Sequence, residues 1–133
     1  MTKRAFDPDG LPAPLGPYSN VVTTPPGRLV FIAGQVALDA DGEVVGAGDI
    51  VAQTRQVMEN LRTALEAAGA TFADVAKVVN YITDVKLFGQ MAAVRKEYLV
   101  EPYPVSTLVE VSALIFPELL IEIEAIAVVR DDR

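Results

Sequence analysis

Histidine and cysteine are both absent from the 133-residue chain. Without them, the chain cannot build a Ser-His or Cys-His nucleophile pair, a histidine-ligated metal centre or a cysteine-bound zinc site. The absence of cysteine also excludes disulfides, which fits a reducing compartment. An acidic cluster does not continue into an EF-hand pattern and is better interpreted as a solvated loop: Asp39, Asp41, Glu43 and Asp49. We therefore expect no metal and no other cofactor.

Positive charge is scarce. Eighteen acidic residues against eleven basic ones give a formal net charge of -7, and no stripe of lysine and arginine alternates with aromatic residues. Because an acidic surface repels phosphate backbones, nucleic acid is not an expected partner. RNA cleavage would in addition need acid-base groups and phosphate-binding cations, which the sequence does not group together.

Long hydrophobic runs are missing as well. Each apolar run is shorter than about 18 residues and is interrupted by charges, so no membrane span is predicted. Residues 1–7 contain a basic pair but lack the apolar segment that follows it in a secretory signal. We therefore expect a cytoplasmic protein with no membrane partner.

The length and composition indicate one compact domain covering residues 1–133. With 51% hydrophobic and only 22% charged residues, the chain is more apolar than a small monomer usually needs. Burial of surface between subunits would explain the excess. A well-packed monomer is the alternative.

Hydrophobic periodicity predicts an α+β domain. Residues 19–24 and 29–33 are typical of a hairpin around a proline-glycine turn. Asp49 is the expected N-cap of a helix that ends at Gly69, because apolar residues recur every three or four positions between them. A strand over 75–83, a helix over 87–99 and two terminal strands complete a β-β-α-β-α-β-β order, which places two helices on one sheet face.

The segment 120–127 places two glutamates inside an apolar strand pattern. Alternation puts Ile121, Ile123, Ala125 and Ala127 on one face, and Leu120, Glu122, Glu124 and Ile126 on the other. This second face is only half polar. We therefore expect another subunit to cover it, or the face to line a cleft.

Several segments along the chain carry a family resemblance. They are Gly16-Pro17-Tyr18-Ser19, residues 30–35 ending in Gly34-Gln35, Gln53, Asn60-Leu61, Ala68-Gly69, residues 74–77 and residues 121–125. In order and spacing they resemble the Rid (YjgF/RidA-type) family of reactive-intermediate imine and enamine deaminases. The resemblance implies a chorismate-mutase-like fold, two helices on one face of a mixed sheet, and a homotrimer. It also implies small-molecule sites in the clefts between subunits.

By the same resemblance, Glu122 is the candidate catalytic residue, as a base or as the holder of the hydrolytic water. An interface hydrogen-bond acceptor is the alternative. Tyr18 would orient ligand or water, or would instead anchor its loop. Gly34 would let backbone N–H groups approach a ligand, with Gln35 bonding nearby, or would instead only permit a bend or bulge in the strand. Ser106 and Thr107 would offer hydroxyl or backbone contacts.

One position departs from the family pattern. Members that hydrolyse imino acids have an arginine between the proline and the serine of the segment that reads Pro104-Val105-Ser106 here, so this chain has Val105 at that position. Valine offers no polar atom to a carboxylate, so we expect a more apolar pocket and a ligand without an essential carboxylate. Arg95 is the nearest downstream cation, but its neighbours Lys96 and Glu97 are typical of a solvated helix face. Asn60 and Asn80 are interpreted as helix-surface and strand-end residues.

The expected function is therefore hydrolytic deamination of a reactive imine or enamine metabolite by a Rid-like trimer. A non-catalytic trimer that binds a small metabolite in the same clefts is the alternative. A third possibility is an interaction protein whose trimer surface docks another enzyme.

Overall fold

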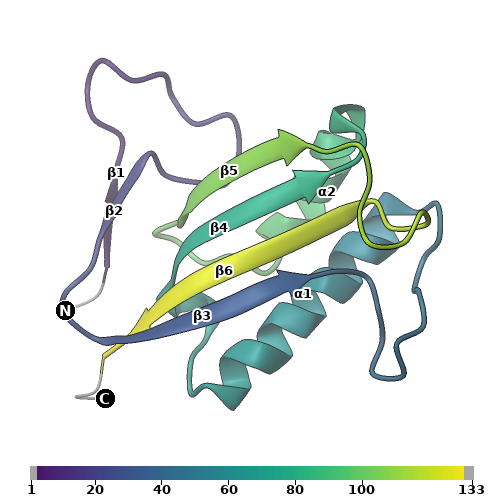
Figure 1. Ribbon diagram of the computed structural model, residues 1–133. Coiled ribbons are helices and arrows are strands. Elements are labelled where there is room, and N and C mark those ends of the chain that lie inside the picture. Colours follow the sequence, from purple (N-terminus) through teal and green to yellow (C-terminus); the bar gives the residue numbers. More distant parts are fainter. Residues whose placement is uncertain (1–2, 131–133) are drawn as a thin grey trace.

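The computed structural model describes residues 3–130, which form a four-stranded sheet with two helices on one face and a two-stranded ribbon beside it (Figure 1). The elements are β1 (Arg4–Phe6), β2 (Val21–Thr23), β3 (Arg28–Gln35), α1 (Ile50–Ala67), β4 (Val75–Ile82), α2 (Phe88–Lys96), β5 (Val105–Glu110) and β6 (Ile121–Val129). Short 3₁₀ turns precede β4 and α2. The predicted α+β arrangement with two helices on one sheet face is confirmed.

The large sheet has the order β3-β6-β4-β5. β6 is antiparallel to both of its neighbours, whereas β4 and β5 run parallel. A parallel pair needs a long crossover connection, and α2 supplies it between β4 and β5. β6 therefore lies in the interior of the sheet, and β3 and β5 form its two edges.

The predicted hairpin of 19–24 with 29–33 is wrong. β2 pairs with β1, a strand that the sequence did not indicate, and β3 pairs with β6. The proline pair between β2 and β3 has no N–H groups to continue a ladder. Gly27 then passes so close to β6 that an added Cβ would lie 2.6 Å from the carbonyl oxygen of Val129. The chain therefore leaves the ribbon and enters the large sheet at this point.

Both helices form close to their predicted positions. The side chain of Asp49 accepts a hydrogen bond from the N–H of Ala52 at 3.1 Å, which confirms it as the N-cap of α1. The helix ends at Ala67, and Gly69 follows with a φ of 74°. Such a positive φ favours glycine, which explains the stop. The second helix begins one residue later than predicted, after a 3₁₀ turn over 85–87, and ends at Lys96, three residues earlier than predicted.

The core lies between the helices and the sheet, and β6 divides its residues as predicted. Alternate residues of β6 are buried against the helices: Ile121, Ile123, Ala125, Ala127 and Val129. The intervening residues, including both glutamates, are only half-buried. They belong to the helix-free side of the sheet, which we call the open face. Leu29 and Phe31 of β3 share this face and are 58% and 70% exposed.

Candidate functional site

The carboxylate of Glu122 lies directly over Gly34. A Cβ atom built at Gly34 would be 1.9 Å from Oε2 of Glu122, a distance that no real contact allows. Only glycine leaves room for the carboxylate here. The ladder between β3 and β6 shifts register between Ile32 and Gln35, so the strand is irregular at this glycine. Among the described residues, none donates a hydrogen bond to the Glu122 carboxylate, which is therefore open to water or ligand.

Glu124, two residues further along β6, is in a different situation. Its Oε1 accepts a hydrogen bond from the hydroxyl of Tyr81 at 2.5 Å. This bond, with desolvation and the charges of Glu124 and Glu122 as smaller causes, raises the pKa of Tyr81 above its ordinary value. Of the two glutamates of β6, Glu124 is hydrogen-bonded to a protein donor within residues 3–130, whereas Glu122 is not.

The start of β6 is held in place by Gln53 of α1. This side chain is fully buried, and its Oε1 accepts from the N–H of Leu120 at 2.8 Å. Its Nε2 donates to the carbonyl oxygens of Glu118 at 2.8 Å and of Gly46 at 3.0 Å. Because the bonds to Glu118 and Leu120 act on the backbone just before β6, they fix the position from which Glu122 extends, while the third bond ties the loop before α1 to the same side chain.

Gln35 follows Gly34 at the end of β3. Its Nε2 donates to the carbonyl oxygen of Ala33 at 3.1 Å, so its amide is turned back onto its own strand. Gly34 and Gln35 also line a broad open groove of about 740 Å³ beside α1. Asn60 borders this groove and donates to the carbonyl oxygens of Val36 and Leu38, which ties the segment after β3 to the helix.

The remaining predicted residues gather at the start of β5. The N–H of Ser19 donates to the carbonyl oxygen of Pro104 at 2.9 Å, and Ser19 forms a parallel bridge with Val105. Tyr18 is therefore next to the β5 edge, where its half-buried hydroxyl accepts from the N–H of Leu15 at 3.1 Å. Val105 and Thr107 share the open face with β4 residues Lys77 and Val79, to which they are paired.

Within one chain, the residues around Glu122 and the residues at the start of β5 lie far apart. In the ladder, Glu122 is opposite Tyr81, which is opposite Val109. Val105 precedes Val109 by four residues and lies two strands from β6, which corresponds to a separation of about 16 Å between Glu122 and Val105. The Glu122-Gly34-Gln35 group and the group at the start of β5 therefore occupy different ends of the sheet.

Ser106 points to the helix side, where it meets Arg95 and Asn80. Arg95 is only 1% exposed and donates through Nη1 to Oδ1 of Asn80 at 2.7 Å and to Oγ of Ser106 at 3.2 Å. Asn80 is fully buried within β4 and donates to Oγ of Ser106 at 2.9 Å. Burial lowers the pKa of Arg95 to about 10, so its guanidinium remains charged at neutral pH.

The predictions for Arg95 and Asn80 were therefore wrong. Arg95 does not lie on a solvated helix face, and Asn80 is not at a strand end. Arg95 follows Phe88 and Met91 at seven and four residues, a spacing that places all three on one helix face. Because Lys96 and Glu97 are charged, the local sequence indicated a solvated face. The helical spacing from Phe88 and Met91 is the pattern that indicates a buried Arg95.

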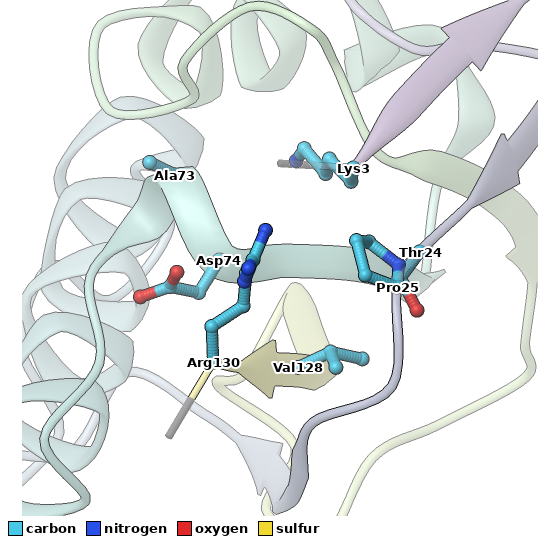
Figure 2. Close-up of a pocket in the computed structure, with 7 residues that line it drawn as sticks. All are labelled: Lys3, Thr24, Pro25, Ala73, Asp74, Val128 and Arg130. Atoms are coloured by element: carbon cyan, nitrogen blue, oxygen red, sulfur yellow. The ribbon is translucent and has the colours of Figure 1, made fainter. Parts of the chain in front are cut away.

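A separate small cavity of about 90 Å³ lies near the two chain ends (Figure 2). Its lining residues are Lys3, Thr24, Pro25, Ala73, Asp74, Val128 and Arg130. The ammonium group of Lys3 donates to the carbonyl oxygen of Val75, and burial lowers the pKa of Lys3 to about 8 against the opposing charge of Asp74. None of the predicted site residues lines this cavity.

Within residues 3–130, no three acidic side chains are grouped so that they could hold a metal ion. Over the same range, neither helix has the length and apolar character needed to cross a membrane.

The Endoribonuclease L-PSP family model matches residues 10–129, which is nearly the whole chain. The chain belongs to the YjgF/RidA-type family.

Curated relatives of this Rid family member cover almost its full length. A RutC family protein from Pyrococcus horikoshii is 46% identical over 126 residues, which is 94% of this chain and 97% of that protein. The 3-aminoacrylate deaminase RutC from Acinetobacter baylyi is 36% identical over 127 residues, with 96% and 98% covered.

Solved structures agree with the fold. A Rid family protein from Yersinia pestis, YyfB, is 38% identical, covers 97% of this chain and 100% of its own, and superposes with a TM-score of 0.81. RidA from Psychrobacter is 35% identical with a TM-score of 0.71, covering 95% and 99%. The chorismate-mutase-like fold expected of a Rid protein is confirmed.

Proposed function

We propose that this Rid family member hydrolyses a reactive imine or enamine metabolite and releases ammonia. The carrying observation is the half-buried carboxylate of Glu122, which lies over Gly34 with no hydrogen-bond donor among the described residues. The A. baylyi relative, named as a 3-aminoacrylate deaminase, supports the reaction class. The lack of cysteine suits a cytoplasmic setting.

In the proposed reaction, Glu122 holds a water molecule and accepts its proton as the oxygen attacks the carbon of the C=N bond. The resulting carbinolamine loses its C–N bond while the nitrogen is protonated. One imine and one water thus give one carbonyl compound and one ammonia, with no change of oxidation state. An enamine enters the same sequence after it tautomerises to the imine. No cofactor is needed for any of these steps.

We further propose a homotrimer whose clefts combine the two groups of site residues. Glu122 and Gly34 from one copy would face Tyr18, Val105 and Thr107 from the next, with Ser106 contributing backbone only, since its side chain points to the helix side. The separation of about 16 Å within one chain supports this arrangement, because only a second copy can complete the site. The exposed Leu29 and Phe31 on the open face also support burial between subunits.

A non-catalytic trimer that binds a small metabolite in the same clefts is the alternative. It is favoured by Val105, which offers no polar atom to a ligand, and by Tyr18, whose hydroxyl accepts a bond from Leu15 within its own loop. The description of the matched family model names an endoribonuclease. The absence of histidine and the net charge of -7 argue against RNA as a substrate here.

The test is ammonia release from 2-iminopropanoate and 2-iminobutanoate, generated in situ by an amino-acid oxidase or dehydratase. Wild type is compared with Glu122→Gln, and Glu124→Gln serves as the matched control because it removes the same charge from a carboxylate that Tyr81 already engages. We expect Glu122→Gln to lose a factor of roughly 100 or more, as for a general base, and Glu124→Gln to lose far less. Ligand-dependent thermal stabilisation without turnover would instead support the binding alternative.

A further inference from the structure

The small cavity of Figure 2 lies where the two-stranded ribbon meets the end of the large sheet. Four segments line it: the residue before β1, the end of β2, the 3₁₀ turn before β4 and the end of β6. Its volume is about 90 Å³. A single water needs only about 10–15 Å³, so the cavity has room for a ligand of several non-hydrogen atoms.

This cavity is separate from the carboxylate of the proposed reaction. Arg130, which lines it, follows Glu122 by eight residues at the end of β6. At the rise of an extended strand, that corresponds to a separation of about 26 Å. A ligand in the cavity therefore does not contact Glu122 of the same chain.

Two cationic side chains share the cavity. Lys3 is only 8% exposed, and its ammonium group donates to the carbonyl oxygen of Val75. Figure 2 shows the half-buried side chain of Arg130 extending from the end of β6 towards Lys3. The whole chain has eleven basic residues and a net charge of -7. Positive charge is thus concentrated here in an otherwise acidic protein, and such a concentration attracts an anion.

One carboxylate, that of Asp74, offsets part of this charge. Its Oδ2 accepts a hydrogen bond from the N–H of Thr71 at 2.9 Å, so the carboxylate also caps its own 3₁₀ turn. The remaining side chains that line the cavity are uncharged. Two positive charges against one negative charge leave a net charge of +1, which a small anion would balance.

We propose that this cavity binds a small oxyanion, a carboxylate or phosphate group, between Lys3 and Arg130. A guanidinium donates two parallel hydrogen bonds to two oxygens of such a group. The ammonium of Lys3 keeps one N–H on the carbonyl oxygen of Val75 and has two more to donate. Sites for drug-sized ligands measure roughly 300–1,000 Å³, so the size of this cavity limits the ligand to a small ion.

A bound oxyanion would link the ribbon to the sheet, because Lys3 precedes β1 and Arg130 follows β6. Binding also requires the protonated form of Lys3. Burial lowers the pKa of Lys3 to about 8, against the opposing charge of Asp74 from the 3₁₀ turn. The other charged group that lines the cavity is Arg130 from β6, and the ribbon residues Thr24 and Pro25 bring none. The affinity for an oxyanion should therefore fall as the ammonium loses its proton above about pH 8.

The experiment follows backbone amide shifts of the full-length protein by NMR at pH 7. Acetate and inorganic phosphate are titrated separately at constant ionic strength, each replacing chloride. We expect saturable shifts at Lys3, Ala73 and Asp74, because these residues line the cavity. Lys3→Met and Arg130→Met should each weaken binding at least about tenfold. Lys96→Met is the matched control, because it removes an exposed lysine at the end of α2 and should bind like wild type.

The two titrations also separate the two kinds of ligand, since tighter binding of phosphate or of acetate identifies the group that the cavity fits. Absence of saturable shifts at the cavity with both anions would overturn the proposal. So would unchanged affinity in folded Lys3→Met and Arg130→Met.

If either variant does not fold, the pH dependence of wild type decides. Acetate affinity should fall about tenfold per pH unit above about pH 8, and a constant affinity from pH 7 to 10 would contradict the role of Lys3. Glu122→Gln should bind the anion like wild type, so the result does not depend on the proposed deaminase function.

Discussion

Substitution of Gly34 by alanine perturbs Glu122 without changing any ionisable group. The new Cβ would lie 1.9 Å from Oε2 of Glu122, 2.8 Å from Cδ and 2.9 Å from Cγ. To reach an ordinary contact of about 3.4 Å, the carboxylate has to move by about 1.5 Å. A displacement of about 1 Å in a positioned group costs roughly 100-fold in rate, so we expect Gly34→Ala to lose at least that factor in ammonia release.

The stability of the same variant should change little by comparison. Only one half-buried, flexible side chain has to swing away, so a loss of at most about 1–3 kcal/mol is expected in urea unfolding. Gly89→Ala is the matched control, because a Cβ at Gly89 in α2 meets nothing within 4 Å. It should leave the rate unchanged. Activity of folded Gly34→Ala within about threefold of wild type would refute the argument that the Glu122 carboxylate must occupy its place over Gly34.

Three further predictions follow from other parts of the molecule. Val105→Arg should raise imino-acid hydrolysis by about tenfold or more, because valine offers no polar atom to the ligand carboxylate; an unchanged rate in the folded variant would show that the missing cation does not limit this reaction. Tyr81→Phe leaves Glu124 without its 2.5 Å hydrogen bond, so a lower urea midpoint is expected; unchanged urea midpoints would contradict it. For Lys3, burial lowers the folded-state pKa from 10.5 to about 8. The unfolded chain then binds more protons between these values, so its contribution to stability rises as pH increases from about 8 to about 10.5. Lys3→Met should remove this rise, and parallel pH profiles of wild type and variant would exclude it.

Local patterns were sufficient for much of the fold. The N-cap at Asp49, the alternation along β6 and the helix stop before Gly69 each depend on residues close in sequence, and all three are confirmed. The pairing of β3 with β6 could not be predicted from local patterns. Its partner β6 is almost a hundred residues away, and adjacency in sequence favoured β2 instead.

In the candidate site, too, local patterns were informative and contacts between residues far apart in sequence were not predictable. The strand pattern placed Glu122 and Glu124 on the same face without distinguishing them, and only the family resemblance selected Glu122. The difference is made by Tyr81, a partner 43 residues away in sequence. The room above Gly34 is likewise a property of two strands side by side. Arg95 was misplaced because the polarity of its neighbours outweighed the spacing that puts it against the sheet.

The measurement that tests the central claim most directly is complementation between two variants. Glu122→Gln disables one group of site residues, and Val105→Asp disables the other by placing a negative charge on the open face at the start of β5. Each is expected to be inactive alone in ammonia release from 2-iminobutanoate. If the site is shared between copies, refolding the two together should restore activity, with about a quarter of the clefts carrying both intact groups. Mixed oligomers that remain inactive would contradict a site built between subunits.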